Sequence, residues 1–379
     1  YHLRQPPGPA MWRQNIASTD NRGFKLEAAL SDDFGTWTAG VDGFSEEHDS
    51  NIDNPKNPMF FVVNFNAAER EVLGAFLERQ QDLGGQWSGE LGLRVNHVSA
   101  DAGEVNGTPA MMMPPAQMLR DAFNAADRDQ SDTNIDIVAR LEYGLSESLS
   151  LYGGLAQKQR SPSYQERYLW LPLEATGGLA DGQVYVGNIE LHPERSRGLE
   201  FGVVVQQSGF SLRPRVFYNR VDDYILGTPL GAMHPATMMV RMMNMANGTN
   251  RADPLQFNNV DAKLYGFDMD WRWQLSPSWA VSGLVNYVRG ERRDIDDDLY
   301  RIAPANMTNR LTYAANRWDV TVESVLYASQ DRVSDASREL ESAGYGIVNL
   351  HARWQLSPAL ELAGGVDNVF DKTYRPHLG

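Results

Sequence analysis

The sequence predicts an all-β chain whose strands form the wall of an antiparallel transmembrane β-barrel. One observation is that apolar and polar residues alternate with a period of two in many segments, which is typical of strands with one apolar and one polar face. The other is that very short and very long connections follow each other in turn. Outer-membrane barrels have this asymmetry, with short periplasmic turns and long extracellular loops, whereas a soluble sandwich or propeller has no reason for it.

The clearest strand lies at 265–275, where six apolar residues occupy alternate positions and polar residues or glycine lie between them. A turn at Ser276 and Pro277 precedes a second alternating segment from Trp279 to Tyr287. Tryptophans beside such short turns fit the aromatic girdle of a membrane barrel. The same pattern predicts about fourteen strands, at 21–31, 33–46, 70–80, 85–99, 133–145, 148–160, 196–206, 209–225, 259–274, 277–291, 303–315, 317–330, 344–356 and 358–367. Long loops are expected at 47–69, 100–132, 161–195, 226–258, 292–302 and 331–343.

Composition excludes several classes of function. The net charge is −15, which argues against a general affinity for nucleic acid. The chain has no cysteine, so disulfides, zinc thiolate sites and cysteine nucleophiles are absent. No nucleophile elbow or phosphate-binding glycine loop occurs either, and we expect the protein not to be an enzyme.

Three segments resemble a known family. The end of the chain, DNVFDKTYRPHLG, resembles the Asn-Leu-Phe-Asp-Lys-x-Tyr signature of TonB-dependent outer-membrane receptors, with Val369 in the leucine position. RSPSYQERYLWLPLEATGG, from Arg160 to Gly178, and YVGNIELHPERS, from Tyr185 to Ser196, resemble further segments of the same superfamily. The tract from Glu166 to Pro172, with Thr176 to Gly178, is closer to its copper receptor branch.

The resemblance implies an architecture and a location. Receptors of this family have about 22 strands around a plug, so residues 1–379 are expected to be a partial barrel domain without the plug, the TonB box or the final strand. The implied location is the outer membrane of a Gram-negative bacterium. The implied partners are outer-membrane lipid, a metal ion or metal chelate, and the TonB energy-coupling protein, which would act through the missing plug.

Methionine is concentrated in two of the expected extracellular loops. Six of the fourteen methionines lie in the segment MHPATMMVRMMNM at 233–245, and four more lie at 111, 112, 113 and 118. Thioether sulfur selects soft ions, Cu(I) above all, and imidazole binds both copper oxidation states. His234 and Met238 or Met239 would share one face of a loop helix or turn. The predicted metal ligands are His234, Met233, Met238, Met239, Met242, Met243, Met245, Met111, Met112 and Met113.

These residues leave alternatives open. The methionines could simply fill irregular gaps between long loops, as this flexible side chain often does. The same scaffold could take up an iron chelate, a siderophore, in which case Glu166, Arg167, Tyr168 and Trp170 are the candidate contacts in the ligand loop. A passive porin or structural barrel is a further possibility in another class. The favoured hypothesis is active transport of copper, with the copper ion as the transported ligand and no catalytic cofactor.

Overall fold

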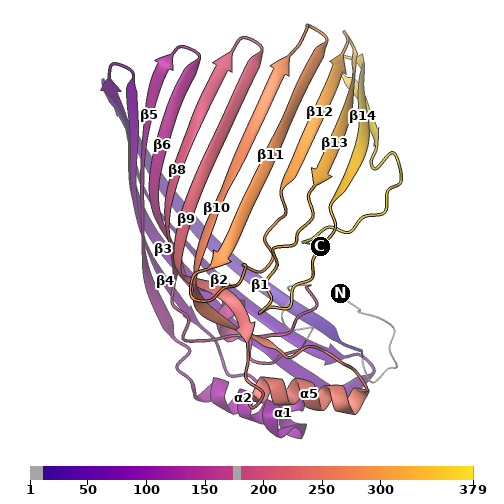
Figure 1. Cartoon of the computed structure of the whole chain (residues 1–379). Coiled ribbons are helices and arrows are strands. Elements are labelled where there is room, and N and C mark those ends of the chain that lie inside the picture. The colour runs from indigo at the N-terminus through magenta and orange to yellow at the C-terminus, as the bar shows by residue number, and fades with distance from the viewer. Residues whose placement is uncertain (1–11, 174–180, 379) are drawn as a thin grey trace.

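The computed structural model describes residues 12–173 and 181–378, and its main feature is a single curved wall of strands (Figure 1). Within these residues, fifteen strands form one sheet in which, apart from β7, strands that follow each other in the chain pair antiparallel, and β1 and β15 stand at the two ends of the pairing order. The predicted all-β antiparallel architecture is therefore confirmed. The strands are β1 (Gln14–Asp32), β2 (Gly35–Asn54), β3 (Asn57–Gly84), β4 (Trp87–Asp101), β5 (Gln130–Ser146), β6 (Leu149–Arg160), β7 (Tyr185–Val186), β8 (Glu194–Gln207), β9 (Phe210–Pro229), β10 (Leu255–Gln274), β11 (Trp279–Arg292), β12 (Asn306–Ala314), β13 (Trp318–Tyr327), β14 (Tyr345–Ser357) and β15 (Leu360–Val366).

Exposure along the wall follows the period of two in the sequence. On β8, Leu199 and Phe201 are 56% and 51% exposed, while the intervening Glu200 is only partly accessible. On β10, Asp268 lies opposite Arg215 of β9 and forms an ion pair with it at 2.8 Å. Apolar side chains thus form a band on the outward face of the wall, and at the same level charged pairs such as Asp268 and Arg215 lie on its inner face, as expected for a barrel in lipid.

One predicted long loop, at 47–69, is wrong. β2 continues to Asn54 and β3 begins at Asn57, so this segment is a long hairpin. Register shifts between His48 and Ser50 and again near Asn51, together with the positive φ of 42° at Ala67, interrupt the pairing. Each bulge reverses which residues face outward. The alternation is therefore lost in the sequence although the strands continue.

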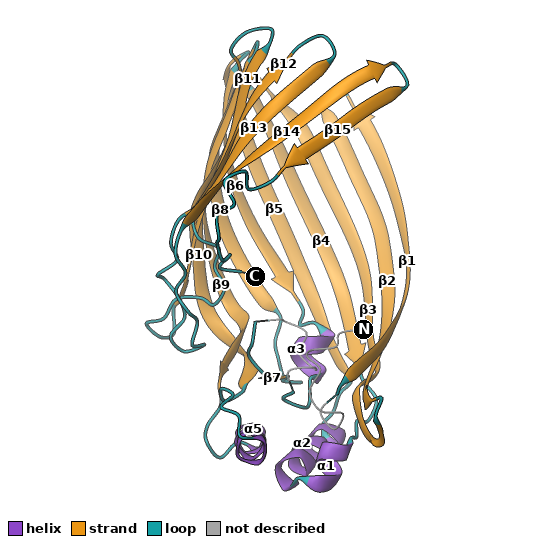
Figure 2. Ribbon diagram, turned by 90° about the vertical axis from the view of Figure 1, so that its right-hand side faces the viewer, coloured by secondary structure: helices purple, strands orange, loops and turns teal. Residues whose placement is uncertain are grey.

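The long connections between β4 and β5, between β6 and β7 and between β9 and β10 carry short helices at one end of the wall, and short hairpin turns lie at the opposite end (Figure 2). The connections between β11 and β12 and between β13 and β14, which lie wholly within the described residues, carry no helix. The helices are α1 (Thr108–Met112), α2 (Pro114–Ala125), α3 (Tyr164–Tyr168) and α5 (Pro235–Asn247). α1 and α2 pack against each other, and α2 packs beside α5 (Figure 1). Among the described residues, no helix combines the length and the apolar character needed to cross a membrane.

We call α1, α2, α3, α5 and the segment 161–173 the mouth assembly. It shares the main buried apolar cluster of the described residues with the neighbouring ends of the strands, and contributes Tyr168, Leu169, Leu171 and Met239, each no more than 1% exposed. The two-residue strand β7 joins this region to the sheet, because Tyr185 and Val186 pair in parallel with Leu255 and Gln256 of β10. Such a short strand carries no recognisable alternation, and the sequence did not predict it.

Candidate functional site

Helix α5 contains the methionine-rich segment and has two different faces. His234, Met238, Met242 and Met245 follow each other at intervals of four, four and three residues, so they lie along one side of the helix. Met242 and Met245 are 42% and 86% exposed. We call these four residues the soft-donor stripe, because it aligns one imidazole and three thioethers.

The opposite face of α5 is buried. Ala236 and Met239 are fully buried, Val240 is 3% exposed, and Met243 packs against the same apolar cluster. Burial of this face holds α5 against the rest of the mouth assembly. The predicted ligands Met239 and Met243 therefore have a packing role in this conformation, and metal binding by them stays a prediction.

The second group of methionines lies on the neighbouring helices. Met111 and Met112 of α1 are 60% and 76% exposed, and Met118 of α2 is 53% exposed. Met113, between the two helices, packs against the apolar cluster. Because α2 and α5 are neighbours, the fold brings both methionine loops to one side of the mouth. Met233, in the turn before α5, is 80% exposed.

His234 is the N-cap of α5. Pro235 at the first helical position has no N–H, and the backbone N–H of Ala236 donates to His234 Nδ1 at 3.2 Å. A nitrogen that accepts a hydrogen bond carries no proton, so the neutral ring has its proton on Nε2. Burial lowers the pKa of His234 from its ordinary value of 6.5. Both effects favour the neutral form, which is the form that binds metals.

The four candidate residues of the ligand loop have partners within the chain. Arg167 Nη2 donates to Asp132 Oδ2 at 2.8 Å and to the Leu191 carbonyl at 3.2 Å. The Tyr168 hydroxyl donates to the Arg128 carbonyl at 2.8 Å, and Trp170 Nε1 donates to the Val63 carbonyl at 2.9 Å. These three side chains are buried and fasten the loop to the wall, so contact between them and a transported ligand stays a prediction.

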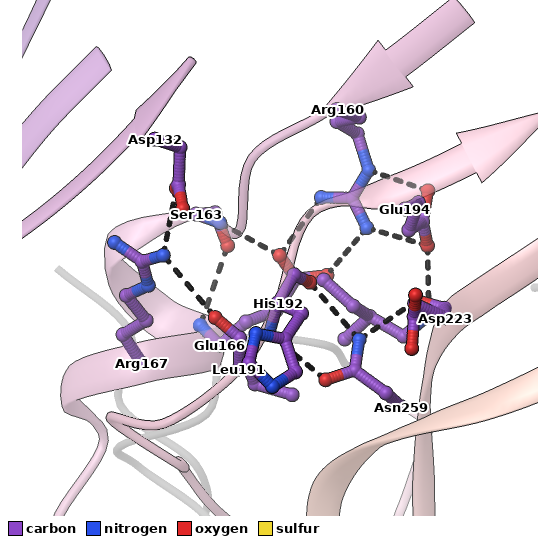
Figure 3. Close-up of polar contacts among 11 residues, drawn as sticks. Asp132, Arg160, Ser163, Glu166, Arg167, Leu191, His192, Glu194, Asp223 and Asn259 are labelled. Atoms are coloured by element: carbon purple, nitrogen blue, oxygen red, sulfur yellow. Dashed lines mark hydrogen bonds and ion pairs between the residues drawn. The ribbon is translucent and has the colours of Figure 1, made fainter. Parts of the chain in front are cut away.

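Glu166 belongs to a network that orders the start of the same loop (Figure 3). Arg160 Nη1 donates to Glu166 Oε2 and Arg160 Nη2 donates to Glu194 Oε1, both at 2.8 Å. Ser163 and Glu166 form a reciprocal capping box at the start of α3. This box was not predicted from the sequence, although Ser followed three residues later by Glu is its usual signature.

Among residues 12–173 and 181–378, no three imidazole or carboxylate groups come together in a way that could hold a metal ion. The candidate site is therefore defined by the soft-donor stripe and by the exposed methionines of α1 and α2. The motif residues Thr176 to Gly178 lie outside the described residues.

Comparisons with known proteins agree on one family. The family model described as TonB dependent receptor-like, beta-barrel, matches residues 5–369. The ferric enterobactin receptor PirA of Pseudomonas aeruginosa is 22% identical over 96% of this chain and 53% of its own length. The pesticin receptor of Yersinia pestis is 22% identical over 97% of this chain and 48% of its own length. The chain thus spans about half the length of these curated relatives.

Solved structures show the same fold. The copper transporter OprC superposes with a TM-score of 0.75 at 22% identity, over 97% of this chain and 53% of that one. The siderophore receptor PirA from Pseudomonas aeruginosa superposes with a TM-score of 0.58 at 15% identity, over 96% of this chain and 62% of that one. At these identities the likeness concerns the fold alone.

Proposed function

The chain belongs to the TonB-dependent receptor β-barrel family of the Gram-negative outer membrane, and from this premise we propose that it forms part of an active transporter for copper. The soft-donor stripe on α5 carries the proposal. Thioether and imidazole donors prefer copper, particularly Cu(I), to hard cations such as Mg²⁺ or Ca²⁺. The copper ion is the substrate and is captured at the mouth before it is transported.

The position of the stripe supports this role. Four potential donors lie on one face of α5. The exposed Met118 lies on α2, which packs beside α5, and the exposed Met111 and Met112 lie on α1, which packs against α2. Filling a core does not account for these side chains, because the buried face of α5 is formed by other residues. The name of the structural neighbour OprC, a copper transporter, agrees with the proposal.

Copper binding by His234 would compete with its capping role. A metal ion at Nδ1 would displace the Ala236 N–H, and a metal ion at Nε2 would move the ring proton to Nδ1, which then could not accept. Either mode frees the first turn of α5. We therefore expect copper loading to loosen the amide of Ala236 while the buried face of the helix stays packed.

The remaining parts of the transporter are proposals drawn from the family. A plug domain would complete the ligand set, and the TonB protein would supply energy through that plug. Residues 1–379 would then be part of the barrel domain.

Copper binding by the whole receptor tests the proposal. Replacing Met238, Met242 and Met245 by leucine conserves side-chain volume and removes the sulfurs. We expect Cu(I) affinity, measured by competition with a chromogenic chelator, to fall by about tenfold or more, which is about 1.4 kcal/mol. The matched control, Met307→Leu in β12, removes a sulfur of the wall that is not among the predicted ligands and should leave affinity unchanged. Unaltered Cu(I) binding by the triple variant would refute the copper assignment.

Uptake of a ferric siderophore is the second candidate, favoured by the names of the curated relatives, which include a ferric enterobactin receptor. A ferric chelate is bulky and bears hard oxygen donors, so its binding should not depend on thioether sulfur. Binding of the ferric chelate can be measured by the quenching of tryptophan fluorescence. This candidate would be favoured if the triple leucine variant still bound the chelate and the parent protein bound no measurable Cu(I).

A further inference from the structure

Strands β8, β9 and β10 are neighbours in the wall (Figure 1), and their outward face carries three cationic side chains in one row. Arg197 of β8 is directly opposite Arg220 of β9, and Arg220 is directly opposite Lys263 of β10. Their side chains are 51%, 56% and 35% exposed. We call Arg197, Arg220 and Lys263 the basic row.

The basic row borders the apolar surface of the wall. Two residues further along the same strands, and so on the same face, Leu199, Tyr218 and Tyr265 form the next row in register. Leu199 and Tyr218 are 56% and 43% exposed. The helices of the mouth assembly lie on the opposite side of the basic row from Leu199, Tyr218 and Tyr265. The three cations therefore mark the extracellular boundary of the lipid-facing band.

Few carboxylates neutralise this row. The single carboxylate of Asp222 is shared by three guanidinium groups, those of Arg197 at 3.0 Å, Arg220 at 3.4 Å and Arg293 at 2.9 Å. Glu291 forms ion pairs with Lys263 and with Arg289. Like charges directly opposite each other destabilise a sheet. A row of cations sharing two carboxylates, in a chain with net charge −15, therefore has capacity for a further anion.

The other side of the wall is the opposite in charge. On β1 to β4, four acidic residues lie directly opposite each other on neighbouring strands, and all four are exposed: Asp20, Glu47, Glu69 and Asp101. They follow the apolar outward residues of these strands on the side of the mouth. An exposed position at the membrane boundary therefore does not by itself require a basic residue. The basic row is confined to β8–β10.

We propose that the basic row docks the phosphorylated head group of an outer-leaflet glycolipid. Arginine guanidinium groups bind phosphate through paired N–H donors, and clusters of Lys and Arg at a membrane boundary bind anionic lipid head groups. The adjoining Leu199 and the rings of Tyr218 and Tyr265, stacked at 24° with centroids 6.4 Å apart, offer an apolar surface to the acyl chains. A lipid supplies both the phosphate and the chains at this position, whereas a soluble anion supplies only the phosphate.

The test uses the whole receptor and lipids that differ only in phosphate. The basic-row variant combines Arg197→Gln, Arg220→Gln and Lys263→Gln. The matched control combines Glu47→Gln, Glu69→Gln and Asp101→Asn on the acidic side. Each protein is titrated with bisphosphorylated lipid A and with its dephosphorylated form in detergent, and bound lipid is counted by native mass spectrometry.

We expect the basic-row variant to bind bisphosphorylated lipid A about 100-fold more weakly, since each cation near a lipid surface contributes about 1 kcal/mol. The control variant should bind it as the parent does, and the dephosphorylated lipid should not distinguish the proteins. Equal binding of bisphosphorylated lipid A by parent and basic-row variant would overturn the proposal. Displacement of the lipid by an equal concentration of inorganic phosphate would also overturn it, because the site would then hold a free anion.

A gain-of-binding variant separates the proposal from a folding defect. Asp222→Asn removes the carboxylate that Arg197, Arg220 and Arg293 share. Freed guanidinium groups should bind bisphosphorylated lipid A several-fold more tightly, about fivefold for one surface charge. Misfolding cannot raise affinity. Weaker or unchanged binding by Asp222→Asn would contradict a phosphate site formed by these arginines.

Discussion

The wall and the mouth assembly keep their apolar side chains in opposite places. Leu30 and Leu199 on the wall are 74% and 56% exposed, whereas Leu171 and Met239 in the mouth are fully buried. The wall depends on its backbone ladders and on lipid, which accepts apolar surface. The mouth depends on burial of side chains away from water, as a soluble protein does. One chain therefore combines two sources of stability. Substitutions that remove buried side chains should destabilise the mouth assembly and leave the wall in place.

The largest expected effect is the loss of Trp170 from the mouth. Its side chain is 3% exposed and its indole N–H donates to the Val63 carbonyl. We expect Trp170→Ala to lower the free energy of opening of the mouth by about 3–5 kcal/mol, measured by hydrogen exchange of α2 and α5. Trp273→Ala is the control, since Trp273 is 54% exposed on the wall. Comparable deprotection of α5 in both variants would show that the two regions are not independent.

The two faces of α5 provide a comparison within one helix. Met239 is fully buried, so Met239→Ala should destabilise the mouth by about 2–5 kcal/mol. Met242 is 42% exposed, and Met242→Ala should change stability by no more than about 0.5 kcal/mol. Hydrogen exchange of α5 in the metal-free receptor measures both. Equal destabilisation would mean that the soft-donor stripe is also part of the core.

A smaller loss of stability than those of Trp170→Ala and Met239→Ala is expected at the N-cap of α5. Because burial lowers the pKa of His234 below 6.5, the folded helix binds its proton less readily than the unfolded segment does. The contribution of the neutral cap is thus fully present above pH 6.5 and decreases as the pH falls from there to the folded pKa. We expect a loss of about 1 kcal/mol at the start of α5, seen as faster exchange of the Ala236 amide.

His234→Asn is the matched control for that titration. Asparagine is a good N-cap and does not titrate in this range. Protection of the Ala236 amide should then be independent of pH once the intrinsic exchange rate is taken into account. A pH response that persists in this variant would assign the effect to another group.

The strands could be predicted where residues keep strict alternation. The segment from Tyr265 to Leu275 predicted β10, which ends at Gln274. The hairpin near Asn54 could not be predicted, since bulges at His48 and Ser50 break the alternation. The spacing of His234 and Met238 predicted that both lie on one face of a helix, but nothing in the sequence indicated that this helix packs beside α2.

The partners of the ligand-loop residues could not be predicted for a different reason. Arg167 and Trp170 bond to Asp132 and Val63, which are 35 and 107 positions away in the sequence. Contacts over such separations depend on how the sheet curves and on where the loop returns to it. The residue types alone were therefore compatible with ligand contacts and with structural anchoring.

The two-residue strand β7 has a mechanical consequence. It places the backbone of Tyr185 and Val186 against the start of β10, and the Leu255 N–H donates to the Val184 carbonyl at 2.8 Å. β10 begins a few residues after α5 ends. The connections that carry α3 and α5 therefore share a backbone attachment at the start of β10. Displacing either connection alone would strain these hydrogen bonds, so the pairing favours movement of the two connections together.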